Sequence, residues 1–218
     1  MTGDISRRDV LATGLVAAAG AGSPAPAEGA EPKLPAGAVE TRFDLEAGGL
    51  EGWTTVAGEW AVEARPGAPS GARALVQRAT RNPFNVIVAP PGPFTDVDVT
   101  VRVQPIAGRE DASGGIVVRF ADGRYYVIRA NALENNFRLY YNDRGRRQLA
   151  TATVAPPALG RWHTLRVVAL GDRLQGWLDG AALLDHRDAR FKAGRVGLWT
   201  KADSITAFDD LVIRGIRA

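Results

Sequence analysis

The stretch VDVTVRVQ, residues 97–104, decides the fold class of this 218-residue chain. Valine occupies every odd position, and Asp, Thr, Arg and Gln occupy the positions between. Successive side chains of a β-strand point to opposite faces, so this alternation predicts a strand with one buried face. A similar stretch, Ile116 to Phe120, leads to Asp122-Gly123, a dipeptide typical of a tight hairpin turn. These features indicate antiparallel strands joined by short turns.

The same pattern continues towards the C-terminus. Turns rich in Gly, Asp and Asn recur roughly every 8–12 residues, a spacing typical of β-sandwiches. We therefore expect an all-β protein, an antiparallel sandwich of two sheets. Residues 181–191 are the exception, because they alone suggest a short helix or an irregular crossing. The further segments that we expect to form strands are 125–130, 137–141, 165–169, 174–178, 196–200 and 208–216.

The N-terminal residues predict an export signal. Ser6-Arg7-Arg8-Asp9-Val10-Leu11 precedes a weakly apolar run that ends at Ala21, and Ala25-Pro26-Ala27 resembles a cleavage site. This order predicts a twin-arginine signal peptide over residues 1–27, although a disordered Ala/Gly-rich tail is the alternative. The run is too short to span a bilayer, so we expect no membrane attachment after cleavage. We expect an exported protein, periplasmic or extracellular, with a flexible linker over 28–40 and one folded domain over 41–218.

Composition excludes several classes of function. The chain has 27 basic and 24 acidic side chains, and its arginines are scattered, so we expect no nucleic-acid partner. It has no cysteine and two histidines, which removes thiol nucleophiles and disfavours zinc. Asp203, Asp209 and Asp210 could ligate calcium, but solvated carboxylates on an edge strand are the expected reading. We predict no cofactor and a monomer.

Motifs for common catalytic and nucleotide sites are absent from the sequence. There is no Gly-x-Ser-x-Gly, phosphate-binding loop, dinucleotide-binding glycine motif or His-Glu-x-x-His. A serine hydrolase, a nucleotide-dependent enzyme and a zinc peptidase are therefore disfavoured.

Three segments together resemble a known family. They carry its paired tryptophans, its Ser-Gly strand and its Trp-containing hairpin. The segments are LEGW (50–53) with EWAVE (59–63), DASGGIVVR (111–119), and RWHTLRV (161–167) with GDRL (171–174) and WLDG (177–180). The resemblance is to the 3-keto-disaccharide hydrolase domain, in the concanavalin A-like jelly-roll group, with this chain as a divergent member.

The resemblance implies a bent jelly-roll sandwich whose concave face holds a saccharide. In that family the sugar is already oxidised at C3, so a base can remove the C2 proton and the glycosidic oxygen can leave. Such a site needs a base, a group that stabilises the enolate and an acid. This chain departs from the family in the stretch 125–129, where Tyr126 stands in place of the usual carboxylate. The departure puts the 3-keto chemistry in doubt and suggests a distinct subgroup.

The polar stretch 129–138 is the first candidate site. Arg129, Asn131, Glu134, Asn135 and Asn136 offer forked donors and amides suited to sugar hydroxyls, and Glu134 is a candidate base. The alternative is a turn in which Asn residues tolerate positive φ and cap the backbone.

The second candidate site is the segment 199–204. Trp199 and Lys201 share one side of the expected strand, and Asp203 follows them. An indole beside a cation and a carboxylate suits a sugar ring, which stacks through its C–H face. The alternative is that Trp199 is buried. If Arg129 and Trp199 face one groove, the two stretches make a single site.

We therefore expect a carbohydrate-active domain whose partner is a saccharide or glycoconjugate. If it is an enzyme, we expect hydrolysis of a glycoside, with Glu134 or Asp203 as base and Arg129 or Lys201 stabilising the oxyanion. A non-catalytic, lectin-like glycan-binding module is the alternative. A sandwich with no affinity for sugars is the third possibility.

Overall fold

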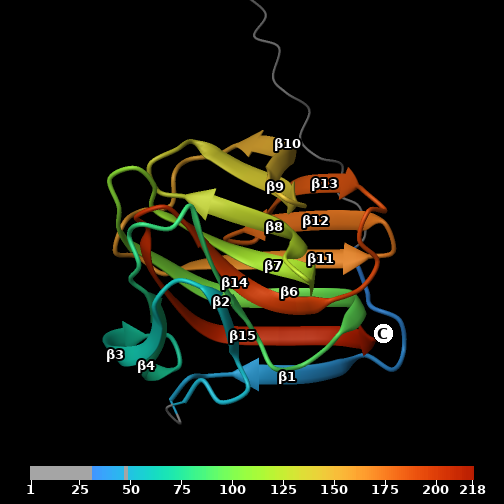
Figure 1. The fold of residues 1–218 in the computed structure, drawn as a ribbon, viewed down its shortest axis with the longest axis horizontal. Coiled ribbons are helices and arrows are strands. Elements are labelled where there is room, and N and C mark those ends of the chain that lie inside the picture. Colours follow the sequence, from blue (N-terminus) through green and yellow to red (C-terminus); the bar gives the residue numbers. More distant parts are fainter. Residues whose placement is uncertain (1–30, 47–48) are drawn as a thin grey trace, which may run out of the picture.

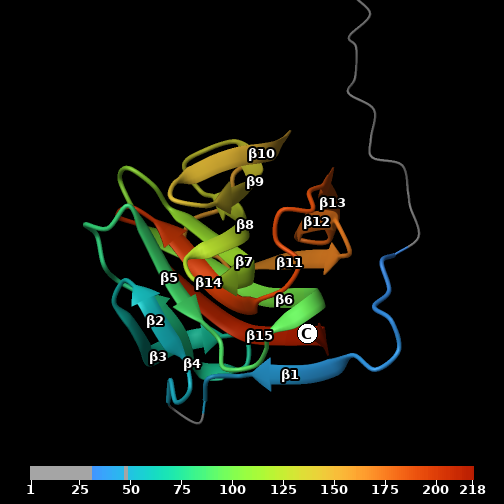
Figure 2. The same ribbon diagram turned by 45° about the vertical axis from the view of Figure 1, so that its right-hand side comes forward.

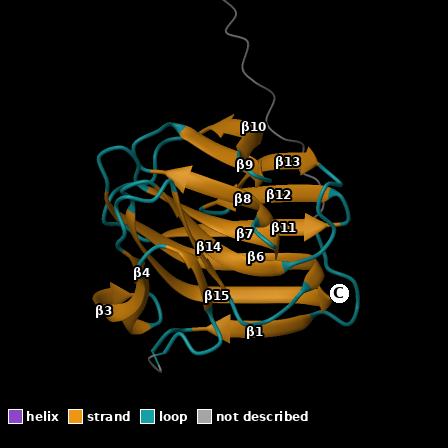
Figure 3. Cartoon of the chain, viewed as in Figure 1, coloured by secondary structure: helices purple, strands orange, loops and turns teal. Residues whose placement is uncertain are grey.

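The computed structural model describes residues 31–46 and 49–218, and all regular elements in this part of the chain are β-strands. The strands form two antiparallel sheets that stack as layers (Figures 1 and 3). The predicted all-β, two-sheet sandwich is confirmed. The strands are β1 (Val39–Phe43), β2 (Thr54–Ala57), β3 (Trp60–Ala68), β4 (Gly71–Gln77), β5 (Phe84–Val88), β6 (Phe94–Ala107), β7 (Ser113–Ala121), β8 (Arg124–Asn131), β9 (Asn136–Asn142), β10 (Arg146–Thr153), β11 (His163–Leu170), β12 (Arg173–Leu178), β13 (Ala181–Arg187), β14 (Arg195–Lys201) and β15 (Ile205–Arg217).

The two sheets differ in their strand order. The eight-stranded sheet has the order β13-β12-β11-β6-β15-β4-β3, and β1 also pairs with β15. The seven-stranded sheet has the order β10-β9-β8-β7-β14-β5-β2. Figure 2 shows the second sheet with β9 and β10 at one end and β2 and β5 at the other.

The predicted signal peptide, residues 1–27, and the first three residues of the predicted linker lie outside the described residues. The described part of the linker includes Glu31, whose carboxylate lies 2.8 Å from Arg166 of β11. Strand β1 starts at Val39, two residues before the predicted domain boundary. Among the described residues no helix is long and apolar enough to cross a membrane.

The space between the sheets is filled by the apolar faces that the alternation predicts. Val97, Val99, Val101 and Val103 of β6 are each at most 2 % exposed. They belong to one large cluster with inward-facing side chains of the seven-stranded sheet, and burial of this apolar surface is the main stabilising contribution. The cluster members from the seven-stranded sheet include Ile87, Ile116, Val118, Tyr126, Ile128, Phe137, Leu139, Val196 and Leu198.

The short turns also follow the sequence. Asp122 and Gly123 have φ of 50° and 78°, and Asp179 and Gly180 have φ of 50° and 83°. Positive φ at both central residues is the type I′ hairpin geometry, which Asp-Gly favours because glycine pays no steric cost there. The predicted hairpin between β7 and β8 is confirmed by the pairing of Ala121 with Arg124.

Two expectations are wrong. Residues 181–187 form strand β13, neither a helix nor an irregular crossing, because the Asp179-Gly180 turn folds them back onto β12 and strand pairing overrides the helix propensity of alanine and leucine. Only residues 188–191 are irregular, as the alternative expectation had it. The edge position expected for the C-terminal strand is also wrong, since β15 lies between β6 and β4. Asp209 on β15 is 0 % exposed and accepts hydrogen bonds from the backbone N–H and hydroxyl of Ser70, at 3.0 and 2.7 Å.

Candidate functional site

The outer face of the seven-stranded sheet is concave, as a contact between side chains of the distant strands β10 and β5 demonstrates. Arg146 starts the edge strand β10, and Phe84 starts β5, five strand positions away. In a flat sheet that separation is about 24 Å. The guanidinium carbon of Arg146 nevertheless lies 5.0 Å from the centre of the Phe84 ring. The sheet must therefore curve strongly, and we call its outer side the concave face.

The strand register brings the two predicted stretches onto this face. Trp199 of β14 pairs with Gly115 of β7, Gly115 pairs with Arg129 of β8, and Arg129 pairs with Arg138 of β9. These four residues form one row across the sheet. Lys201 lies two residues beyond Trp199 and so faces the same side. Arg129, Trp199 and Lys201 therefore share one concave surface.

Glycines make the sharp curvature of this face possible. A Cβ atom at Gly115 would lie 2.8 Å from the carbonyl oxygen of Ile128, and one at Gly197 would lie 2.4 Å from that of Ile87. Real Cβ atoms essentially never come so close to backbone. Because bending a sheet crowds its inner curve, the neighbouring strands approach too closely here for any larger residue.

Glu134 is the anion of an ion-pair cluster rather than a free carboxylate. Its Oε2 accepts hydrogen bonds from Arg129 Nη2 and Asn136 Nδ2, both at 2.8 Å, and lies 3.5 Å from Arg138 Nη1. Partial burial opposes ionisation, but these donors outweigh it and lower the pKa of Glu134 to about 2. A carboxylate held so firmly ionised has little affinity for a proton, so it is poorly matched to act as a base at neutral pH.

Trp199 forms the floor of the concave face. It is 0 % exposed, and Phe84 stacks on it with ring centres 5.6 Å apart. The guanidinium carbon of Arg146 lies 5.6 Å from the indole and 4.1 Å from the ring of Tyr140. Phe84 and Arg146 therefore lie above Trp199, and Phe84 is half-buried whereas Trp199 is hidden from solvent.

Lys201 forms an ion pair with the buried carboxylate of Asp111. Its Nζ lies 3.1 Å from Oδ2 of Asp111, which is fully buried, and 4.0 Å from the exposed Glu110. Ser204 donates a further hydrogen bond to Asp111 at 3.2 Å. This pairing holds the ammonium group at the rim of the concave face.

The other predicted site residues support turns beside the concave face. Burial alone would raise the pKa of Asp203, but the backbone N–H groups of Arg109, Asp111 and Glu110 donate to its carboxylate and hold the pKa below its usual range. Asn131 Oδ1 accepts the Leu133 N–H of its own turn and the Ala112 N–H of the segment before β7, and Asn135 is exposed at the tip of that turn. The catalytic and binding roles given to these residues by the sequence remain predictions.

Tyr126, which stands where the resembled family carries a carboxylate, faces the core. It is 0 % exposed, donates a hydrogen bond of 2.6 Å to Asp188 and accepts one of 3.0 Å from the Phe191 backbone. Burial, reinforced by Asp188, raises the pKa of Tyr126 to about 12. This position therefore contributes no group to the concave face.

A pocket of about 320 Å³ opens on the concave face above Phe84. Loop 80–83 forms one side and Arg146 of β10 belongs to its lining, while Lys201 and Glu110 lie at its end. It combines one aromatic ring with charged and amide groups, so its lining is more polar than that of most small-molecule sites and suits a polar ligand. We call it the Phe84 pocket.

Sequence reasoning missed the residues that define this pocket. Phe84, Arg81 and Arg146 were not among the candidates, although Arg146 belongs to the densest arginine group of the domain. One signal for Arg146 was usable. It directly follows the turn 142–145, so it begins the next strand, and in the structure it pairs with Asn142 at the start of β10. The partnership with Phe84 had no local signal, since it depends on the curvature of the sheet.

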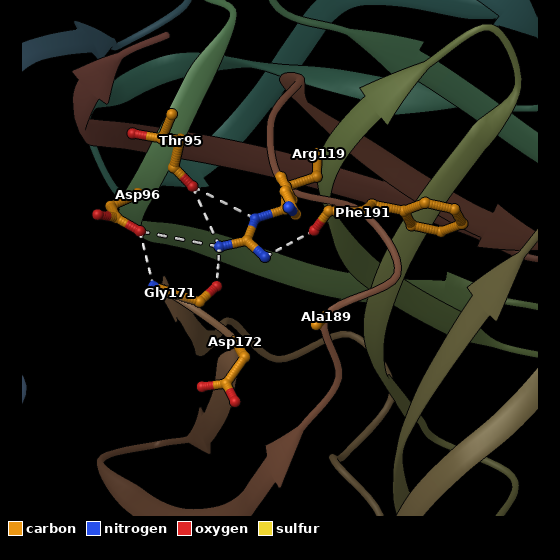
Figure 4. Close-up of a pocket in the computed structure, with 8 residues that line it drawn as sticks. Thr95, Asp96, Arg119, Gly171, Asp172, Ala189 and Phe191 are labelled. Atoms are coloured by element: carbon orange, nitrogen blue, oxygen red, sulfur yellow. Dashed lines mark hydrogen bonds and ion pairs between the residues drawn. The ribbon is translucent and has the colours of Figure 1, made fainter.

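A second pocket, of about 390 Å³, lies at a different place, around the buried Arg119 (Figure 4). Arg119 donates to the carbonyl oxygens of Thr95, Gly171 and Phe191, and Asp96 lies 3.8 Å away. Burial lowers the pKa of this guanidinium. Because backbone carbonyls already accept its hydrogen bonds, Arg119 joins β6, the turn between β11 and β12 and the segment before β14, and it is a less suitable ligand group.

Within residues 31–46 and 49–218 there is no group of three or more His, Cys, Asp or Glu side chains arranged to hold a metal ion.

Comparisons with known proteins agree on the architecture. No family model matches the chain. The levanase of Bacillus subtilis (strain 168) is 24 % identical over 153 residues, which are 68 % of this chain and 21 % of the levanase. The chain thus spans about a fifth of that relative.

Solved structures show the same fold at low identity. The carbohydrate binding module CBM66 from Bacillus subtilis has a TM-score of 0.64 and 21 % identity, covering 73 % of this chain and 93 % of that one. A Bacillus subtilis protein of unknown function with a galectin-like fold has a TM-score of 0.61 and 12 % identity, covering 81 % of this chain and 96 % of that one. The predicted concanavalin A-like jelly-roll sandwich is therefore confirmed as the fold of this chain.

Proposed function

We propose that this domain binds a saccharide in the Phe84 pocket of its concave face. The observation that carries the proposal is the pocket itself, in which an aromatic ring lies among arginine, lysine, asparagine and glutamate side chains. Sugars present apolar C–H faces and polar edges, and such a pocket offers complementary groups for both. The likeness to a carbohydrate binding module and the local similarity to a levanase support this choice.

Binding without turnover is the form of the proposal that the electrostatics favour. A hydrolase acting on a 3-keto-glucoside needs a base near the operating pH. Glu134 is held ionised by Arg129, and Asp203 is occupied by three backbone N–H groups. The hydrolase remains the second candidate because the sequence resembles that family over most of the domain.

Replacing Phe84 by alanine is expected to weaken saccharide binding about ten-fold, because it removes roughly 1.4 kcal/mol of stacking and shape complementarity. A glycan array that includes levan would first identify a ligand of the wild-type protein, and calorimetry would then compare the variants. Phe120→Ala is the matched control, since Phe120 also lies half-buried on the concave face, stacked on Tyr125, but does not line the pocket.

Two results would contradict the binding proposal. Equal affinity of the Phe84→Ala and wild-type proteins would remove the pocket from the interaction. Release of aglycone from 3-keto-glucosides by the wild-type protein, abolished in Glu134→Gln or Asp203→Asn, would favour the hydrolase instead.

We also propose that the domain works outside the cytoplasm, on the strength of Arg7, Arg8 and the apolar run that follows them. The double variant Arg7→Lys/Arg8→Lys of the full chain is expected to accumulate in the cytoplasm at full length. Fractionation of a bacterial host with a twin-arginine pathway, followed by immunoblotting, measures this. Arg144→Lys is the control, and export of the double variant at the wild-type level would reject the assignment.

A further inference from the structure

The concave face carries more positive than negative charge, and the excess gathers at the Phe84 pocket. Around the Phe84 pocket and the neighbouring Glu134 cluster, three carboxylates lie beside five cationic side chains. Glu134 pairs with two arginines, and Asp111 and Glu110 lie beside Lys201. The cationic side chains are Arg81, Arg129, Arg138, Arg146 and Lys201.

Arg146 has its charge largely uncompensated. Among the described residues, no carboxylate lies within ion-pair distance of it, and its Nη1 is buried without a hydrogen-bond partner. Its guanidinium is held instead over the rings of Tyr140, Phe84 and Trp199. Burial lowers the pKa of Arg146, and the charge of Arg129 acts in the same direction, whereas Tyr140, the more distant Asp111 and Tyr125 oppose the shift. An anion beside Arg146 would relieve a real electrostatic cost.

A second guanidinium near the Tyr140 ring, that of Arg129, is also incompletely satisfied. Arg129 is 1 % exposed, and its Nε and Nη1 have no hydrogen-bond partner, while Nη2 donates to Glu134. Buried arginine donors are normally paired, because leaving them unpaired costs desolvation energy. The concave face therefore has a buried cationic side chain, Arg129, in addition to the cationic side chains nearer to solvent.

Arg81 adds a third guanidinium to the pocket from another part of the chain. It lies on the exposed loop before β5, and it lines the same pocket of about 320 Å³ as Arg146 and Phe84. No ion pair joins Arg81 to any carboxylate within the described residues. The pocket thus has two uncompensated guanidinium groups and an aromatic ring.

We propose that the Phe84 pocket binds an acidic saccharide, with the carboxylate of a uronic acid residue held by Arg146 and Arg81. This inference rests on the proposed function and adds the class of sugar. The planar guanidinium fork matches a carboxylate with two parallel hydrogen bonds, whereas a neutral sugar leaves the charge of Arg146 uncompensated. Phe84 and Asn82 then contact the ring and hydroxyls of the same sugar.

The test compares ligands that differ in the presence and kind of negative charge. Calorimetry with the wild-type protein would use an oligogalacturonate, the same oligosaccharide as its methyl ester, and a sulfated oligosaccharide that has no uronic acid. We expect the oligogalacturonate to bind at least ten times more tightly than the ester, because esterification removes the charge-assisted hydrogen bonds. We expect weaker binding in high salt, as for any partly exposed ion pair.

Variants then connect the charge to the pocket. Arg146→Gln is expected to weaken oligogalacturonate binding roughly ten-fold or more, and Arg81→Gln roughly three- to ten-fold. Arg81 is exposed, so its variant tests the pocket even if Arg146→Gln destabilises the fold. Arg144→Gln is the matched control, since it lies in the turn before β10 with its side chain 97 % exposed and changes the net charge equally. It should bind within about two-fold of wild type.

The outcomes separate the two proposals. Equal binding of acid and ester, both weakened by Phe84→Ala, would overturn the acidic-saccharide inference and leave the binding function standing. Equal binding of the sulfated oligosaccharide would overturn the carboxylate assignment. If oligogalacturonate binds but Arg81→Gln and Arg146→Gln behave like Arg144→Gln, the pocket assignment fails. If no saccharide binds, the proposed function fails with it.

Discussion

Gly197→Ala is expected to destabilise the domain by about 3 kcal/mol, the upper range for forcing an extra group into a packed position. The new Cβ would lie 2.4 Å from the carbonyl oxygen of Ile87, so β14 and β5 would have to separate. Gly197 lies within a buried central strand whose pairing holds both neighbours, and no flexible side chain can yield in its place. Chemical denaturation with urea at neutral pH measures the change in the free energy of unfolding.

The matched control for this prediction is Gly49→Ala. A Cβ at Gly49 meets nothing closer than the Glu51 backbone nitrogen at 3.8 Å, so this change should shift stability by less than about 0.5 kcal/mol. We also expect Gly197→Ala to weaken saccharide binding, because a flatter sheet withdraws Arg146 from Phe84. Equal stability of the two glycine variants would show that crowding does not limit the curvature of the concave face.

Glu134→Gln is expected to cost about 2 kcal/mol of stability. Removing one partner of a fully buried ion pair typically costs about 3–5 kcal/mol, because the remaining charge is left without compensation. Arg129 is 1 % exposed, but the Glu134 side chain is 36 % exposed, so solvent screening reduces the expected effect. Urea unfolding at neutral pH measures this loss, with Glu51→Gln, an exposed position, as the control.

The same variant should have a distinct pH profile. The pKa of Glu134 is lowered in the folded state, from an ordinary value of 4.5 to about 2. The ionised form is therefore favoured by folding, so its contribution is complete above about pH 4.5 and is lost as the pH falls towards about 2. We expect Glu134→Gln to lack this part of the acid sensitivity that wild type and Glu51→Gln share. Parallel pH profiles of all three proteins would contradict the ion-pair role of Glu134.

The sequence predicted those parts of the structure that depend on local pattern. Alternation in residues 97–104 identified both a strand and its buried face, and Asp122-Gly123 identified a hairpin, because both signals act over a few residues. The same period correctly placed Trp199 and Lys201 on one side of β14. The prediction for residues 181–187 was wrong because no local pattern decides the conformation of a short run with Ala and Leu. Such a run takes its conformation from the strand with which it pairs.

What the sequence could not predict depends on how far the sheet bends. Trp199 is hidden because Phe84 lies on it, and more than a hundred residues separate the two along the chain. Arg146 reaches the same place from the opposite edge of the sheet. Curvature is a collective property of seven paired strands and the glycines between them, so no local pattern reports it.

The layered build of the concave face has a consequence for redesign of this domain. Trp199, Val117 and Val127 form a buried layer on the concave face. Side chains that line the Phe84 pocket come from loop 80–83 and from Arg146, at the start of the edge strand β10. Arg81 is exposed, so changing it is expected to alter ligand preference with little effect on the packing beneath, whereas Asn82 donates a hydrogen bond to the buried Asn85 and is better left unchanged. Redesign of ligand preference can therefore start at position 81 without disturbing the buried layer.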